Sequence, residues 1–161
     1  MGMDIHIHIL RGNEIIEKEI YDGRNSEWFR NLQGEGWGNA YDSLNYYKVN
    51  GVPEEAPEWI KRTLNIGGYF GHFYLKVKDY MKWFEKYQPN IDAGWVTTYE
   101  KWQIERQHYI PEDVKHYLDA DDVIEDMHFV EFEKKYDNSK WLYYYVKDYL
   151  PDDIIIIYFD W

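Results

Sequence analysis

The chain contains no cysteine and no long hydrophobic run. Without cysteine it forms no disulfide, binds no metal through thiolates and has no cysteine nucleophile. Its longest continuous apolar stretch, residues 154–159, is far too short to cross a bilayer. The first residues also lack the basic and apolar segments of a secretion signal. We therefore expect a cytoplasmic protein with no membrane partner.

Positive charge is scarce as well, because 18 Lys and Arg stand against 30 Asp and Glu, for a net charge of −12. Contacts to nucleic-acid phosphates need clustered basic side chains, so nucleic acid is not an expected partner. The acids are concentrated in residues 112–137, with ten Asp and Glu against three Lys. This pattern is typical of a solvated surface. Together with Asp152 and Asp153, it leaves open an acidic inhibitor that blocks a nucleic-acid-binding or host defence protein.

The apolar pattern predicts an α+β fold in which residues 1–161 form one domain, with a mixed or antiparallel sheet and several packed helices. Residues 3–10 alternate between isoleucine and polar side chains, which predicts a half-buried strand with a wet polar face. A turn at 11–14 and a returning strand at 15–20 complete a hairpin. Residues 154–159 are apolar on both faces, which predicts a central C-terminal strand.

Helical spacing of apolar residues predicts helices over 56–64, 80–87 and 139–150. Ser26 is a candidate N-cap for a short helix, and Thr97 and Glu100 form a candidate capping box for a helix that reaches Gln107. Residues 127–135 read as a strand. The glycine-rich segments 34–39 and 65–71 are expected to be loops, which places Trp37 and Tyr69 in loops.

Asp4, His6 and His8 share one face of the first predicted strand, where imidazoles and a carboxylate could bind a metal or transfer protons. The same pattern is more typical of the polar side of a strand. The patterns of dinucleotide-binding, P-loop, EF-hand and two-histidine phosphoesterase sites are all absent or incomplete. We therefore assign no catalytic residue, no metal and no cofactor.

What remains is a set of side chains suited to binding a small molecule. Arg24 and Asn25 precede a predicted helix start, where phosphate or carboxylate is favoured. His72 follows a glycine-rich segment, and aromatic side chains in loops can stack on bases. The candidate ligand-binding residues are Asp4, His6, Arg24, Asn25, Trp37, Tyr69 and His72.

Five short stretches resemble, in order, an uncharacterised and mostly phage- and prophage-borne family that opens with (Cys)-Asp-Ile-His. They are Asp4–His6, Asp22–Asn25, Val52–Pro53, Gly71–Leu75 and Ile157–Asp160. The chain departs from the family at Met3, which replaces the cysteine, at Phe73 and Tyr74, which replace serines, and at Trp161, which replaces the final asparagine. Loss of the serines argues against chemistry there that depends on a hydroxyl group.

The resemblance implies a small phage accessory protein that acts on host physiology or host defence. By analogy with unrelated phage proteins of this kind, we expect an anti-defence protein that sequesters a nucleotide-like immune signal, such as a cyclic ADP-ribose isomer or a cyclic dinucleotide. The alternatives are a nucleotide-cleaving enzyme that uses Asp4, His6 and His72, and the acidic inhibitor. Self-association into a homo-oligomer stays open. Ligand capture requires the first strand, Arg24 and His72 to meet around one hollow.

Overall fold

The computed structural model describes residues 4–33, 40–66, 68–107, 126–134 and 136–160. Within these residues the chain forms helices and two antiparallel sheets. In chain order the elements are β1 (Asp4–Arg11), β2 (Glu14–Arg24), α1 (Ser26–Leu32), α2 (Ala40–Leu44), β3 (Val49–Asn50), α3 (Glu58–Asn65), β4 (Tyr69–Lys76), α4 (Val77–Tyr87), β5 (Ile91–Thr97), α5 (Thr98–Gln107), β6 (Met127–Glu133), α6 (Ser139–Val146) and β7 (Ile154–Asp160).

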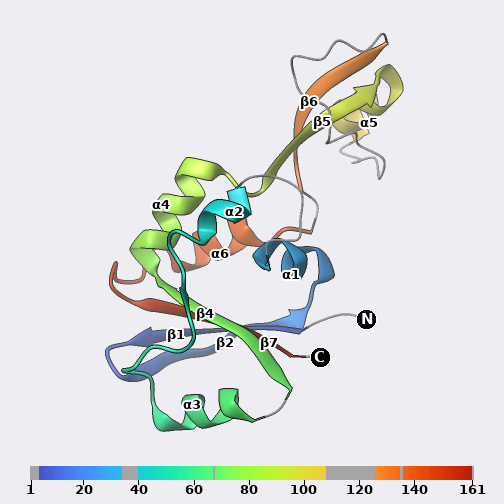
Figure 1. Cartoon of the computed structure of the whole chain (residues 1–161). Coiled ribbons are helices and arrows are strands. Elements are labelled where there is room, and N and C mark those ends of the chain that lie inside the picture. The colour runs from blue at the N-terminus through green and yellow to red at the C-terminus, as the bar shows by residue number, and fades with distance from the viewer. Residues whose placement is uncertain (1–3, 34–39, 67, 108–125, 135, 161) are drawn as a thin grey trace.

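The main sheet has the strand order β2-β1-β7-β4-β3, and every neighbouring pair is antiparallel. The C-terminal strand β7 therefore lies at the centre, as the apolar run of residues 154–159 predicts. Helices α1, α2, α4 and α6 cover one face of this sheet and α3 covers part of the other (Figure 1). Residues 155–159 of β7 are buried because both faces are covered. The α+β class and the central C-terminal strand are confirmed.

Two hydrophobic cores lie on opposite faces of the main sheet, and the isoleucines of β1 and β7 are divided between them. Ile5, Ile7 and Ile9 of β1 join the large core beneath the four helices, since alternate residues of a strand point the same way. Ile156 and Tyr158 join a smaller core with Ile60, Leu64 and other residues of the α3 side. The side chains of Asp4, His6 and His8 consequently belong to the α3 side of the sheet.

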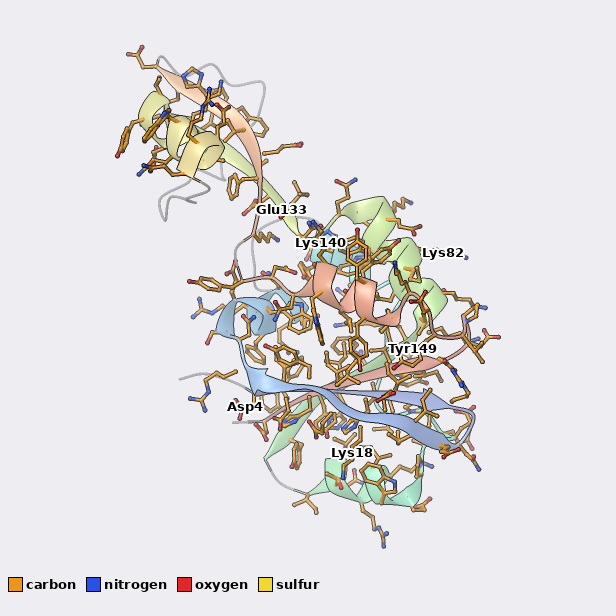
Figure 2. The ribbon with its side chains drawn as sticks, turned by 180° about the vertical axis from the view of Figure 1, so that it is seen from behind. Asp4, Lys18, Lys82, Glu133, Lys140 and Tyr149 are labelled. Carbon is orange, nitrogen blue, oxygen red and sulfur yellow. The ribbon has the colours of Figure 1, made fainter. Side chains whose placement is uncertain are left out.

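Strands β5 and β6 form a two-stranded ribbon that projects from the main body together with α5 (Figure 1). The predicted capping box at the start of α5 is confirmed. The Glu100 N–H donates to the Thr97 hydroxyl at 3.1 Å, and the Thr97 N–H donates to the Glu100 carboxylate at 2.8 Å. At the base of the ribbon, Glu133 forms an ion pair with Lys140 at 2.9 Å, and both are labelled in Figure 2.

Several sequence-based expectations need correction. Asn25, not Ser26, is the N-cap of α1. Tyr69 lies in strand β4 rather than in a loop, because the strand continues through Gly71 with a bulge. The polar face of β1 is not wet either, since His6 is 8% exposed and His8 is fully buried.

Helices α3 and α4 and strand β6 lie where the apolar spacing predicts them, whereas α6 ends at Val146 and is shorter than expected. Helix α2 and strands β3 and β5 were not anticipated. No helix among the described residues is both long and apolar enough to cross a membrane.

Candidate functional site

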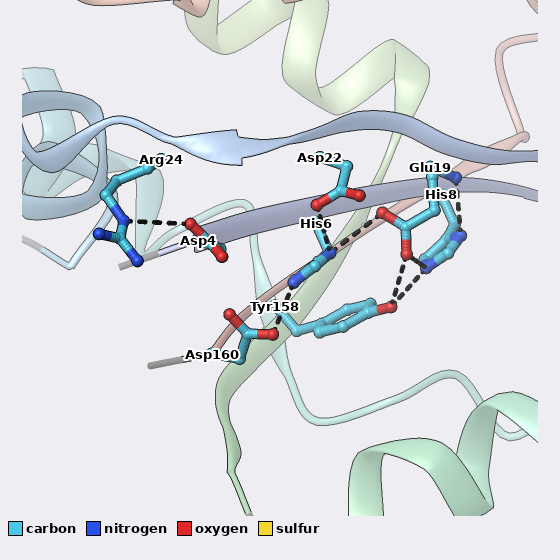
Figure 3. A network of polar contacts seen from close by, with 8 residues as sticks. All are labelled: Asp4, His6, His8, Glu19, Asp22, Arg24, Tyr158 and Asp160. Atoms are coloured by element: carbon cyan, nitrogen blue, oxygen red, sulfur yellow. Dashed lines mark hydrogen bonds and ion pairs between the residues drawn. The ribbon is translucent and has the colours of Figure 1, made fainter. Parts of the chain in front are cut away.

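A network of polar side chains occupies the end of the main sheet where β1 begins and β7 ends (Figure 3). The antiparallel register places Asp4 opposite Arg24 of β2 on one side and opposite Asp160 of β7 on the other. Tyr69 of β4 is in turn the register partner of Asp160. Strands β1, β2, β4 and β7, from the two ends and the middle of the chain, therefore supply the side chains of this site.

His6 is the centre of the network. Its Nδ1 lies 3.0 Å from the Glu19 carboxylate and 3.5 Å from that of Asp22, while its Nε2 lies 3.1 Å from the Asp160 carboxylate. Burial opposes a positive charge, but the contacts with Glu19 and Asp160 outweigh it and raise the pKa of His6 above its ordinary value. The ring also stacks on Tyr158, with centroids 5.0 Å apart. His6 is thus a partly shielded imidazole held between carboxylates.

His8, two residues further along β1, has the opposite character. Its Nδ1 accepts a hydrogen bond from the Glu19 backbone N–H at 3.1 Å, and its Nε2 lies 2.6 Å from the Tyr158 hydroxyl. Burial, with the nearby charges of His6 and Lys18, lowers the pKa of His8 to about 4. A neutral ring with the proton on Nε2 satisfies both contacts. His8 therefore positions its neighbours and has no free nitrogen for a metal.

Glu19 owes its position to the backbone. It has a φ of +55°, a left-handed conformation that costs a residue other than glycine about 1–2 kcal/mol. Strand β2 departs from regular pairing with β1 between Ile7 and Leu10. This irregularity turns one carboxylate toward both histidines of β1, with contacts of 3.0 Å to His6 and 3.7 Å to His8. Strain of this kind is concentrated at functional sites.

Four of the seven predicted ligand residues lie in or beside this network. Asp4 and His6 come from β1, and the Arg24 guanidinium lies 3.4 Å from the Asp4 carboxylate. The Arg24 side chain is 61% exposed, so it is open to a ligand. The Tyr69 ring contacts His6 edge to face, with centroids 6.1 Å apart.

The other three residues do not join the network. The Asn25 side chain accepts from the Trp28 N–H at 3.0 Å and donates to the Tyr136 carbonyl at 2.7 Å, so its polar atoms hold α1 in place. His72 lies within β4, burial lowers its pKa, and its buried Nδ1 has no hydrogen-bond partner. Among the described interactions, none links His72 to Asp4, His6 or Arg24. The expected meeting of the first strand, Arg24 and His72 around one hollow is therefore not seen in these interactions, and any ligand capture must be argued without His72. Trp37 lies outside the described residues.

Two of the acids considered for an acidic inhibitor, Asp152 and Asp153, form ion pairs within the fold. Asp153 is buried, and the Arg11 guanidinium donates to both of its carboxylate oxygens, at 2.8 and 2.7 Å. Asp152 forms ion pairs with Lys76 and Lys78 at 3.5 and 3.1 Å. The charge of Asp153 is thus paired inside the fold, whereas Asp152 remains exposed beside two lysines. Residues 112–125 of the acidic stretch lie outside the described part of the chain.

An open hollow of about 350 Å³ lies elsewhere, against α4 and α6. Its lining includes Phe84, Asn90, Lys140 and Tyr143. None of the six described residues that the sequence predicts to bind a ligand lines this hollow. This hollow therefore does not belong to the polar network around His6.

Four members of the network were not among the predicted ligand residues: Glu19, Asp22, Tyr158 and Asp160. An unbroken hairpin continued from the Arg11–Glu14 pair would set Glu19 opposite His6, whereas the irregular register sets Asp22 there. Asp160 and Tyr158 appeared only as the end of a core strand. Three of the five stretches that carry the family resemblance, Asp4–His6, Asp22–Asn25 and Ile157–Asp160, do contain network residues. This signal could have found Asp22, Tyr158 and Asp160, whereas Glu19 lies in none of the stretches.

Acidic groups dominate the chemistry of the site. The carboxylates of Glu19, Asp22 and Asp160 surround the His6 imidazole, and at the outer edge Arg24 forms an ion pair with Asp4. Such a surface can accept hydrogen bonds from hydroxyl groups, bind a cation or exchange protons with a ligand. A search against protein-family models, curated proteins and solved structures finds no match to this chain.

Proposed function

We propose that this protein captures a nucleotide-like small molecule at the polar end of the main sheet. The observation that carries the proposal is the convergence of Asp4, His6, Arg24 and Tyr69, which come from three different strands. Residues up to 65 positions apart thereby offer carboxylate, imidazole, guanidinium and aromatic groups within one surface. These are the groups that a ribose, a phosphate and a base require.

Each group of this surface suits a different part of a nucleotide, because the groups differ in charge and in hydrogen-bonding capacity. Ribose hydroxyls are donors, and the carboxylates of Asp4 and Asp160 are acceptors, so the sugar faces the acids. A phosphate is repelled by those acids and is directed to Arg24 at the exposed edge, where the guanidinium can bind it in a bidentate manner. Tyr69 supplies a ring face or edge for the base. The arrangement favours a ligand with few phosphates over a highly charged one.

The first experiment is mass spectrometry of small molecules released by denaturing the natively purified protein. An intact nucleotide in stoichiometric amount would support capture. The second is calorimetric titration with cyclic ADP-ribose and with cyclic di-AMP. In Arg24→Gln we expect binding at least tenfold weaker, whereas the matched control Arg62→Gln, on the exposed side of α3, keeps the wild-type affinity. Absence of any nucleotide in both experiments would contradict the proposal.

Nucleotide cleavage is a second candidate, and the surroundings of His6 favour it. An imidazole between the carboxylates of Glu19 and Asp160 can carry a proton at neutral pH and donate it to a leaving group. Here His72 takes no part, since no described interaction links it to His6. Recovery of cleaved nucleotide instead of intact ligand, with turnover lost in His6→Asn, would favour the enzyme over capture.

A further inference from the structure

Three side chains direct ligand atoms toward one point beside His6. The imidazole Nδ1 and carboxylate oxygens of Glu19 and Asp22 all lie within 4.8 Å of one another. Figure 3 shows both carboxylates on the Nδ1 side of the ring, with Asp160 on the other side. One nitrogen and two carboxylates at such spacing are a common ligand set for a divalent metal.

The backbone places these groups together. Asp22 is the register partner of His6 across the β1–β2 pair, so its carboxylate faces the imidazole. Glu19 is three residues from Asp22, so in a regular strand that keeps the Asp22 register its side chain would point to the opposite face of the sheet. Its left-handed φ of +55° instead turns its carboxylate toward the same nitrogen. Two acids of one strand thus converge on one imidazole of the next.

The hydrogen bond on the far side of the ring defines which nitrogen is available. His6 Nε2 lies 3.1 Å from the Asp160 carboxylate and Nδ1 lies 3.0 Å from that of Glu19, and both carboxylates are acceptors. A metal at Nδ1 would displace the proton on that side, while Nε2 keeps its proton and donates it to Asp160. Histidines that bind metals typically donate their other N–H to a carboxylate in this way. In a neutral ring the lone pair of Nδ1 then points at the two carboxylates, and a cation between them removes this repulsion.

The neighbouring polar groups are engaged and do not compete for that place. His8 uses both nitrogens for the Glu19 N–H and the Tyr158 hydroxyl, and Asp4 pairs with Arg24. The candidate site is accessible, because the side chain of His6 is 10% exposed but those of Glu19 and Asp22 are 31% and 60% exposed. An ion can therefore reach the buried imidazole from the carboxylate side.

We propose that His6, Glu19 and Asp22 bind one divalent transition-metal ion, with Asp160 orienting the imidazole from outside the coordination shell. The imidazole selects ions of the Mn²⁺, Fe²⁺, Co²⁺ and Zn²⁺ class over Mg²⁺ and Ca²⁺, which prefer all-oxygen sites. Three protein ligands leave positions open for water or a bound molecule. The site goes beyond the proposed function and does not depend on it, because it requires no nucleotide.

The test is calorimetric titration of the metal-free protein, produced without a polyhistidine tag, with ZnCl₂ and separately with MnCl₂. We expect one ion per chain, tighter binding of Zn²⁺ than of Mn²⁺, and much weaker binding of MgCl₂. Asp22→Asn should weaken Zn²⁺ binding at least tenfold. The control Glu14→Gln alters an exposed acid of the same strand outside the cluster and should leave the affinity unchanged.

A second variant tests the outer carboxylate. Asp160→Asn keeps the shape of the side chain but replaces the charged acceptor of the His6 Nε2 hydrogen bond with a neutral amide. We expect a 10- to 100-fold loss of Zn²⁺ affinity. Circular dichroism and thermal unfolding of the metal-free variants identify any that fail to fold, and Asp22 is exposed enough for Asp22→Asn to fold.

Absence of stoichiometric Zn²⁺ or Mn²⁺ binding, or equal affinity in wild type and Asp22→Asn, would overturn the proposal. So would an equal loss in Glu14→Gln. Because metal alone is the probe, nucleotide binding by the metal-free protein would be unaffected by such a failure.

Discussion

His8 and Tyr158 lie on neighbouring strands, and the imidazole Nε2 of His8 is 2.6 Å from the Tyr158 hydroxyl oxygen. The two rings also stack, with centroids 5.3 Å apart and an interplanar angle of 16°. Since the Glu19 N–H donates to Nδ1 of the same ring, the proton of the neutral imidazole is on Nε2. The Tyr158 hydroxyl accepts it and turns its own proton toward Glu19, 3.5 Å away. His8 thus supports the acid that contacts His6.

The two histidines of β1 should titrate on opposite sides of the ordinary histidine value of 6.5. We expect His8 to have a pKa of about 4, because burial and the nearby cations disfavour its charged form. His6 should titrate above 6.5, because Glu19 and Asp160 outweigh its burial. Nitrogen chemical shifts of the imidazoles, followed by NMR from pH 3 to 9, would measure both. A His8 midpoint above that of His6 would contradict the geometry.

The lowered pKa of His8 makes the free energy of unfolding depend on pH. Between pH 6.5 and about 4, the unfolded chain takes up a proton at His8 that the folded chain does not, so stability falls as the pH drops. The loss attributable to His8 is about 3 kcal/mol. His6 acts with the opposite sign, since its stabilisation is present below pH 6.5 and is lost as the pH rises through its folded pKa. Urea unfolding at pH 6.5 and 4 should show a smaller fall in His8→Gln than in wild type.

Tyr158→Phe should lower the free energy of unfolding by about 1–3 kcal/mol at pH 7. The variant removes the acceptor of the His8 Nε2–H, and the His8 side chain is buried, so the donor is left without a partner. Urea denaturation measures the loss. Tyr74→Phe, in the neighbouring strand β4, is the matched control and should stay within about 0.5 kcal/mol of wild type. Equal losses in the two variants would show that the hydrogen bond between His8 and Tyr158 does not add to the free energy of unfolding.

Gly71→Ala should destabilise the fold far more than Gly12→Ala, although the two glycines have φ values of +63° and +62°. Both variants place an L side chain in the left-handed region, which costs about 1–2 kcal/mol. At Gly71 the new Cβ would also lie 2.9 Å from Cδ2 of Phe159, whereas at Gly12 nothing lies within 4 Å. Overpacking adds about 1–3 kcal/mol. Thermal unfolding of both variants is the measurement, and similar midpoints would contradict the β4 bulge.

Asn25→Ala should lower the free energy of unfolding by about 1–2 kcal/mol, because the side chain that caps α1 at the Trp28 N–H is lost. Ser26→Ala should have an effect within about 0.5 kcal/mol, since Ser26 is the first helical residue and not the cap. Urea denaturation of the two variants shows which of the two residues caps α1. A larger loss in Ser26→Ala would restore the assignment that the sequence suggests.

Much of the site could not be read from the chain. Asp4 and His6 were identifiable because alternation in a strand assigns them to one face, and Arg24 because it precedes a helix. The position of Asp22 depends on two register irregularities in β2, one of which spans the left-handed backbone at Glu19, and no local sequence pattern indicates them. Tyr69 was expected in a loop, because glycines on both sides resemble a turn and the bulge in β4 is not visible in the sequence.

The amino-acid sequence by itself determined the alternating strand β1, the buried central strand β7 and the capped start of α5. Each depends on residues a few positions apart, whose spacing sets the periodicity or the hydrogen bond. Only the tertiary structure decided that His6 meets Asp160, 154 residues later, and that Glu19 and Asp22 share its other nitrogen. Strand order and register create those contacts, and both are set by the packing of the whole sheet between its helices.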